Sequence, residues 1–224
     1  MSSSSQVNRM STSDIAYEEI KKKIIEMQYD PQQHLIEEQL SEDLSVSRTP
    51  LRQALYRLIL EGLLVKQSNG RIHVAPISLS EMEEIYRVRE VLEGLLSKEA
   101  ALNMTEPKLK ELEDIIVLMK LSAEQQRNEH LIMYGSQFHS VLYSLSTNQT
   151  AKRFMEQINT QVERYRRVGL KSPSYSSAVS ILEHEKIIKL IRENKPDEVE
   201  TEMRLHISRR FQVAKETVEM YLEP

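Results

Sequence analysis

The stretch LIEEQLSEDLSVSRTPLRQALYRLILEGLLVKQSNGRIHV, residues 35–74, decides the fold of this chain. It predicts a short helix, a tight turn, a second helix and two short strands around Asn69-Gly70. Arg48, Arg52 and Arg57 lie within the eleven residues that begin at Ser47, and no acid lies among them. The whole chain has 34 acids and 30 bases, so this local absence of acid needs an explanation.

The residues around this stretch complete the pattern of a winged helix-turn-helix, a fold that inserts one helix into DNA. A helix is predicted from Thr12 to the residue before Asp30-Pro31, because proline disfavours helix in the residue before it. Ser47 is predicted to be the N-cap of the third helix, with Pro50 in its first turn. The apolar positions are Tyr17, Ile20, Ile24 and Met27 in the first helix, Ile36, Leu40 and Leu44 in the second, and Leu51, Leu55, Leu58 and Ile59 in the third.

A β-hairpin is predicted to follow the third helix. Gly62 ends that helix as a C′ glycine, and residues 63–66 and 71–75 are predicted strands. Asn69-Gly70 between them is the dipeptide most typical of a hairpin turn. Three helices and a hairpin within about sixty residues make up a winged helix.

The segment SVSRTPLRQALYRLILEGLL, followed by NGRIHV, resembles the DNA-binding domain of the GntR family of bacterial transcription regulators. The resemblance covers about residues 14–76. One departure is visible, since the family usually has Pro-Gly where this chain has Pro31-Gln32. We expect the DNA-binding surface to consist of Ser47, Arg48, Thr49, Arg52, Gln53, Gly70 and Arg71, with Arg48 and Arg52 contacting guanine in the major groove.

Composition excludes several other classes of protein. The chain has no Cys, which excludes disulfides and thiolate metal sites, and only 5 Gly and 7 Pro, which disfavours a loop-rich β fold. Its apolar runs are too short to span a bilayer, and the Ser-rich amino terminus is not a secretory signal. We therefore expect a cytoplasmic protein that does not contact membranes. The net charge of −4 means that placement of charge, not its total, must carry DNA binding.

The remainder of the chain has helical periodicity throughout. A capping box at Ser80 and Glu83 begins the first of about six helices. These helices are predicted over residues 80–102, 107–126, 128–146, 149–170, 175–193 and 196–221. We therefore predict a mainly α protein with a disordered tail (1–11), a winged helix-turn-helix domain (12–76), a linker (77–79) and an all-α bundle (80–224).

Three histidines fall on the apolar stripes of three different bundle helices. They are His139, His184 and His206. A single histidine in such a position is usually a hydrogen-bonded core residue. Three that converge also suit a divalent metal such as zinc or nickel, because neutral imidazole is their commonest ligand. The sequence leaves both interpretations open.

The order of elements in the bundle resembles the FCD domain of the FadR subgroup of GntR regulators. The resemblance rests on VREVLEG, on Phe138-His139, on Glu183-His184 and on MRLH at 203–206. It implies a divalent metal held by an acid and by His139, His184 and His206, with a small carboxylate effector bound to that metal. The acid is expected four residues before His139, where this chain has Gly135.

Arg89 lies on the inward stripe of the first bundle helix, and a buried guanidinium needs an anionic partner. That partner is either a protein acid such as Glu93 or the carboxylate of an effector. Tyr134 and Arg164 are further candidates for the effector pocket. Asn148 is expected to cap the helix that follows it.

We therefore expect a cytoplasmic DNA-binding transcription regulator that is not an enzyme. It would be a homodimeric repressor that binds a short palindromic operator in double-stranded DNA and responds to a carboxylate effector. Two alternatives remain open. The bundle is only a dimerisation scaffold, or the chain is a metal-dependent enzyme with an appended DNA-binding module. No catalytic motif of the G-x-S-x-G or H-E-x-x-H type is present in the sequence.

Overall fold

The computed structural model describes residues 10–169 and 176–222, and the chain divides into two compact units between Ile77 and Ser78. Each unit is described by itself. Residues 1–9 of the predicted disordered tail lie outside the described residues. So do the predicted helix end at residue 170 and the predicted helix start at residue 175.

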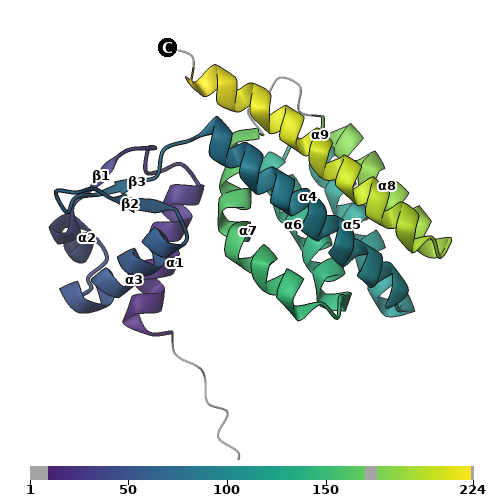
Figure 1. Ribbon diagram of the computed structural model, residues 1–224, viewed down its shortest axis with the longest axis horizontal. Coiled ribbons are helices and arrows are strands. Elements are labelled where there is room, and N and C mark those ends of the chain that lie inside the picture. The colour runs from purple at the N-terminus through teal and green to yellow at the C-terminus, as the bar shows by residue number, and fades with distance from the viewer. Residues whose placement is uncertain (1–9, 170–175, 223–224) are drawn as a thin grey trace, which may run out of the picture. The chain divides into compact units, whose positions relative to one another are not determined.

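In its described part, residues 10–77, the first unit contains three helices and a three-stranded antiparallel sheet (Figure 1). Its elements are α1 (Thr12–Ile25), β1 (His34–Leu35), α2 (Glu37–Asp43), α3 (Arg48–Leu60), β2 (Leu64–Lys66) and β3 (Ile72–Val74). β3 is the central strand and pairs Leu35 with Ile72 on one side and Leu64 with Val74 on the other. The predicted winged helix-turn-helix is confirmed.

The core of this unit lies where the predicted apolar stripes meet. Ile20 and Ile24 of α1 are fully buried together with Leu51 and Leu58 of α3. Ile36 was predicted to share the apolar stripe of the second helix with Leu40 and Leu44. That prediction was wrong, because Ile36 is 43% exposed. The short strand β1 was not predicted, and it buries Leu35 and leaves Ile36 as the N-cap of α2.

The departure from the family pattern at Gln32 places a residue other than glycine in an unfavourable backbone conformation. Gln32 has a φ of 66°, in the left-handed region that glycine occupies most easily. Its N–H nevertheless donates to the carbonyl of Val74 over 3.0 Å. This bond ties the loop after α1 to the end of β3.

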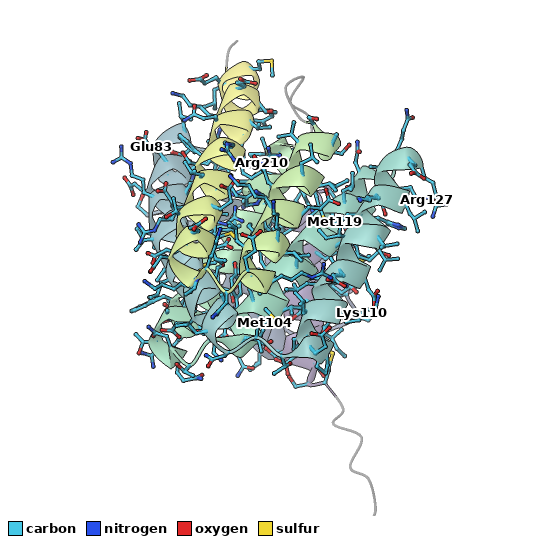
Figure 2. All side chains as sticks on the ribbon, turned by 90° about the vertical axis from the view of Figure 1, so that its right-hand side faces the viewer. Glu83, Met104, Lys110, Met119, Arg127 and Arg210 are labelled. Atoms are coloured by element: carbon cyan, nitrogen blue, oxygen red, sulfur yellow. The ribbon has the colours of Figure 1, made fainter. Side chains whose placement is uncertain are left out.

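The second unit is all helical within the described residues (Figure 1). Its elements are α4 (Leu79–Leu102), α5 (Glu106–Glu124), α6 (Asn128–Leu145), α7 (Gln149–Gly169), α8 (Ser177–Arg192) and α9 (Pro196–Leu222). α4 packs against α6, α7 and α9, and α8 packs against α5 and α9. Figure 2 shows charged side chains such as Glu83, Lys110 and Arg127 on the outside of these helices.

Two capping arrangements define the ends of these helices. The hydroxyl of Ser78 accepts from the N–H of Glu81 over 3.3 Å, so the N-cap of α4 is Ser78, and the predicted capping box at Ser80 is wrong. Asn148 accepts from the N–H of Ala151 over 3.0 Å and caps α7 as predicted. Within the described residues, no helix is long and apolar enough to cross a membrane.

Candidate functional site

The amino-terminal end of α3 forms an exposed polar surface. Ser47 is the N-cap of this helix, and its side chain makes no capping hydrogen bond. The predicted DNA contacts Ser47, Arg48, Thr49, Arg52 and Gln53 are all exposed. The opposite face of α3 is buried, and its apolar side chains fix the direction in which the polar ones point.

Acids from other elements lie against each of the three arginines of this stretch. The Nε of Arg52 lies 2.8 Å from Glu37, and Arg48 lies 3.4 Å from Glu38, both acids of α2. Arg57 lies 2.7 Å from Asp14 of α1. The run that has no acid in sequence is therefore paired with acids by the tertiary structure.

Arg57 differs from the other two arginines. Its guanidinium lies 3.8 Å from the centre of the Tyr17 ring, on the side of α3 that packs against α1. Arg48 and Arg52 instead flank the polar amino-terminal end. Both side chains are exposed there.

The turn between β2 and β3 forms the tip of the wing. Gly70 has a φ of 84°, which favours glycine, and a Cβ built on it would meet no atom within 4 Å. The N–H of Arg71 donates to the side-chain oxygen of Asn69 over 2.9 Å. Gly70 and Arg71 are exposed, as a backbone contact to DNA requires.

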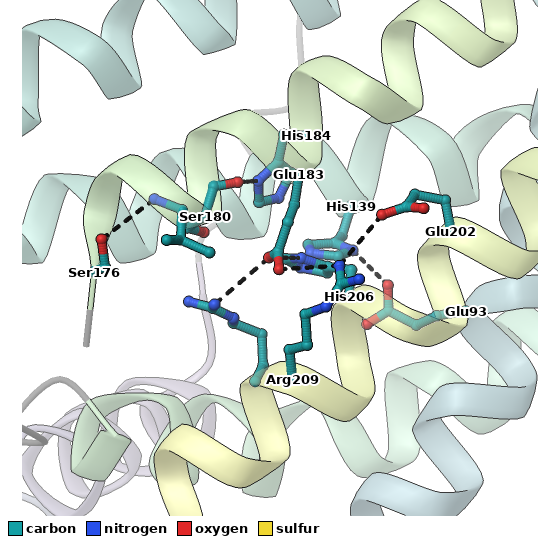
Figure 3. A network of polar contacts seen from close by, with 11 residues as sticks. Glu93, His139, Ser176, Ser180, Glu183, His184, Glu202, His206 and Arg209 are labelled. Atoms are coloured by element: carbon teal, nitrogen blue, oxygen red, sulfur yellow. Dashed lines mark hydrogen bonds and ion pairs between the residues drawn. The ribbon is translucent and has the colours of Figure 1, made fainter. Parts of the chain in front are cut away.

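The second unit brings the three predicted histidines together. His139 comes from α6, His184 from α8 and His206 from α9, and all three are buried (Figure 3). One ring nitrogen from each lies within 4.8 Å of the others. Three imidazoles at this separation form a possible ligand set for one metal ion.

Each of these histidines has its Nδ1 held by an oxygen. The Nδ1 of His184 lies 2.6 Å from the carbonyl of Ser180, and the Nδ1 of His206 lies 2.8 Å from the carboxylate of Glu183. The Nδ1 of His139 contacts the carboxylate of Glu93. Because a carbonyl can only accept, His184 is protonated on Nδ1 and its Nε2 carries a lone pair. This Nε2 is buried and has no hydrogen-bond partner among the described residues.

Burial keeps the three imidazoles neutral at pH 7. It lowers the pKa of His139 to about 4, although the adjacent Glu93 opposes the shift. Burial and the neighbouring imidazoles lower the pKa of His184 and His206 well below the ordinary value for histidine. Neutral imidazole with an oxygen-bound Nδ1 is the form in which histidine binds metals. The donor set therefore fits a divalent metal.

A cavity of about 80 Å³ opens beside the histidines. It is lined by Tyr86, Arg89, Leu131, Ile132, Gly135, His139, Arg166, Ser180, His184, His206, Arg210, Val213 and Ala214. Sequence reasoning predicted Arg89 here and missed Arg166 and Arg210. Arg166 directly follows a buried tyrosine, and Arg210 lies four residues after His206 on the same face of α9. The four-residue spacing between His206 and Arg210 could have identified Arg210 as a cavity residue from the sequence.

The partner of Arg89 is a protein acid. Its Nε donates to Glu93 over 2.6 Å, and their side chains are 1% and 0% exposed. Burial opposes ionisation of Glu93, but His139 and Arg89 hold the pKa of its carboxyl well below the ordinary value. Tyr134 packs edge-on against His130 and Arg164 is buried near Tyr165, and neither lines the cavity.

The fold and these sites define a class: a winged helix-turn-helix unit followed by a helical bundle with a buried histidine cluster. Comparison with protein families identifies both parts. Residues 12–74 match the bacterial regulatory proteins of the gntR family, and residues 84–209 match the FCD domain. The chain belongs to the GntR family and carries an FCD domain. It is a DNA-binding transcriptional regulator.

Individual relatives agree with this assignment. The Nta operon transcriptional regulator of Aminobacter aminovorans is 27% identical over 81% of this chain and 84% of its own length. The transcriptional repressor RspR of Escherichia coli K12 is 23% identical over 85% and 83%. The structure of E. coli McbR/YncC has a TM-score of 0.78 at 19% identity, covering 95% of this chain and all of that one, and so shares its fold.

Proposed function

We propose that this regulator is a repressor whose affinity for its operator is controlled by a small carboxylate effector, bound with a divalent metal at His139, His184 and His206. The observation that carries the proposal is the buried Nε2 of His184. It has no partner among the described residues and lies in a cluster of three neutral imidazoles beside an arginine-lined cavity. RspR, a relative over most of its length, is a repressor.

The metal would be zinc, nickel or a similar ion, and when bound it would act as a Lewis acid that holds the oxygens of the effector. The protein's own groups do the remaining work. Glu93, Glu183 and the carbonyl of Ser180 orient the three imidazoles through Nδ1. Arg89, Arg166 and Arg210 supply positive charge for a carboxylate.

On DNA, Arg48 and Arg52 would contact guanine O6 and N7 in the major groove, with Gln53 beside them. Ser47 and Thr49 would contact phosphate, and Gly70 and Arg71 would approach the backbone or the minor groove. The exposure of all seven residues supports this assignment.

One winged helix contacts one half-site, so we propose a homodimer that binds a short palindrome in the cytoplasm. Exposed apolar side chains on the bundle support a dimer interface there. Val88 and Val91 of α4 are each 50% exposed, and Leu182 of α8 is 63% exposed.

A hydrogen-bonded contact connects the cavity to the start of the bundle unit. The hydroxyl of Tyr165 lies 2.9 Å from Glu81 and 3.1 Å from the carbonyl of Ser78, the N-cap of α4. Arg166, the next residue of α7, lines the cavity. An effector that moves Arg166 would therefore also move Tyr165 and Ser78, the N-cap of α4.

The decisive experiment is elemental analysis of protein purified without chelator, compared with the His184→Ala/His206→Ala double variant. We expect stoichiometric metal in the wild type only. A thermal-shift screen of small carboxylic acids, with and without metal, then tests effector binding. A gel shift on a selected operator, with and without the acid, tests whether the effector releases the protein from DNA. Absence of metal in both proteins, together with no stabilising acid, would leave the bundle as a dimerisation scaffold.

A further inference from the structure

We propose that the metal and the effector bind to this bundle as a thermodynamically coupled pair. An anionic group of the effector occupies the space beside Gly135 and completes the coordination that three histidines begin. Each partner then raises the affinity of the protein for the other. This inference rests on the proposed metal site and deepens it.

The first observation is the empty space at Gly135. This residue lines the cavity and lies one helical turn before His139 on the same face of α6. A Cβ built on Gly135 would meet no atom within 4 Å. The wall of the cavity beside His139 is therefore open, and a small ligand can approach the histidine cluster there.

The second observation is that the acids near the histidines are already engaged. Glu93 is bound by Arg89 and His139. Glu183 is bound by His206, at 2.8 Å, and by Arg210, at 3.5 Å. The described residues that line the cavity include no acid. Among the described residues, none of these acids is free to serve as an anionic fourth ligand, so the effector would supply it.

The third observation is the excess of positive charge. Three arginines (89, 166 and 210) line the cavity, and two carboxylates (93 and 183) contact the histidines, which leaves one positive charge uncompensated. A divalent ion would raise the excess to three. Burying charge without compensation is costly, so the metal alone is disfavoured and an anion relieves the cost.

The fourth observation is a set of unused hydrogen-bond donors. The Nη1 of Arg89 and both the Nε and Nη1 of Arg210 are buried without a partner among the described residues. Arg210 lies on α9 (Figure 2). Guanidinium groups bind planar carboxylates well, so a carboxylate with one oxygen toward the histidines and another toward these arginines would satisfy both. The cavity of about 80 Å³ limits the ligand to a small organic acid.

The experiment measures coupling in the full chain. The protein is stripped with a chelator, and Ni²⁺ is titrated by calorimetry in a buffer free of carboxylate and phosphate, then again with acetate or succinate. We expect either anion to tighten Ni²⁺ binding by about tenfold to about a hundredfold. Linkage requires that Ni²⁺ tighten binding of the same anion by the same factor, which a thermal-shift titration measures.

Substitution at Gly135 provides the matched test. Gly135→Asp supplies the missing carboxylate from the protein, so Ni²⁺ should bind tightly without added anion and the coupling should disappear. Gly135→Asn has the same shape without the charge and should not restore tight binding. Thermal melting of the stripped proteins checks that both variants fold.

The outcomes separate this inference from the proposed metal site. Ni²⁺ binding by the wild type that is equally tight with and without acetate and succinate overturns the coupling and leaves the metal site intact. Ni²⁺ binding by neither the wild type nor Gly135→Asp overturns the metal site itself. The wild-type titrations decide the question even if Gly135→Asp does not fold.

Discussion

The Nε of Arg52 lies 2.8 Å from a carboxylate oxygen of Glu37, so an acid of α2 holds an arginine near the amino-terminal end of α3. A guanidinium bound through Nε keeps its two terminal nitrogens for another partner. That pair matches the O6 and N7 of guanine. The contact with Glu37 therefore leaves these two nitrogens of Arg52 available for the base contact proposed above.

Substitution of Glu37 should separate orientation from charge. Glu37→Gln and Glu37→Ala remove a negative charge from the surface proposed to bind DNA, which should raise affinity for all DNA sequences. If Glu37 orients Arg52, they also relax the base preference at one position, by about 1 kcal/mol. Selection and sequencing from a randomised duplex library measures that preference. A uniform rise in affinity with unchanged base preference would reduce Glu37 to an electrostatic role.

Arg52→Ala should weaken operator binding by about 1–3 kcal/mol and relax sequence preference at the same position. The matched control is Arg57→Ala, because Arg57 stacks on Tyr17 and pairs with Asp14, and it is not among the residues proposed to contact bases. We expect that control to leave base preference unchanged. Equal gel-shift affinity of Arg52→Ala and the wild type would mean that the recognition surface lies elsewhere.

Glu99 should make the stability of the bundle depend on pH. The hydroxyl of Ser146 and the N–H groups of Asn148 and Thr147 bind its carboxylate and lower the pKa of Glu99. A lowered pKa in the folded state gives stability that is present above the unfolded value, about 4.3, and is lost as pH falls through the folded value.

Glu99→Gln should therefore lower the free energy of unfolding at neutral pH, by about 1 kcal/mol as for other helix caps. The difference from the wild type should shrink as the solution is acidified below about pH 4. Urea unfolding of both proteins at each pH measures this. A difference that stays constant across that range would show that ionisation of Glu99 does not contribute.

The core of the winged helix should be sensitive to a cavity at Leu58. This side chain is 0% exposed, so Leu58→Ala should cost about 2–5 kcal/mol of unfolding free energy. Leu60→Ala, two residues along the same helix, is the control, because Leu60 is 68% exposed and its loss should change stability by less than about 0.5 kcal/mol. Calorimetric melting distinguishes them. Similar costs for both would contradict the packing described for α3.

Much of the fold follows from local patterns. The apolar stripes of α1 and α3, Gly62 after α3 and Asn69-Gly70 in the wing predicted the winged helix, because they act within a few residues of chain. The strand β1 escaped prediction, since two residues carry no periodicity. The sequence does not distinguish Ser78 from Ser80 as the N-cap of α4, because each serine precedes a glutamate by three residues.

The sequence by itself determined the winged helix-turn-helix, the helical bundle and the identity of the three histidines, because helical periodicity is a local property that selects which faces are buried. Only the tertiary structure decided which charges meet. It placed Glu37 and Glu38 against the arginines of a run without acid, and it brought Arg166 and Arg210 to the cavity beside Gly135. These contacts join different helices, and their geometry depends on how the cores pack.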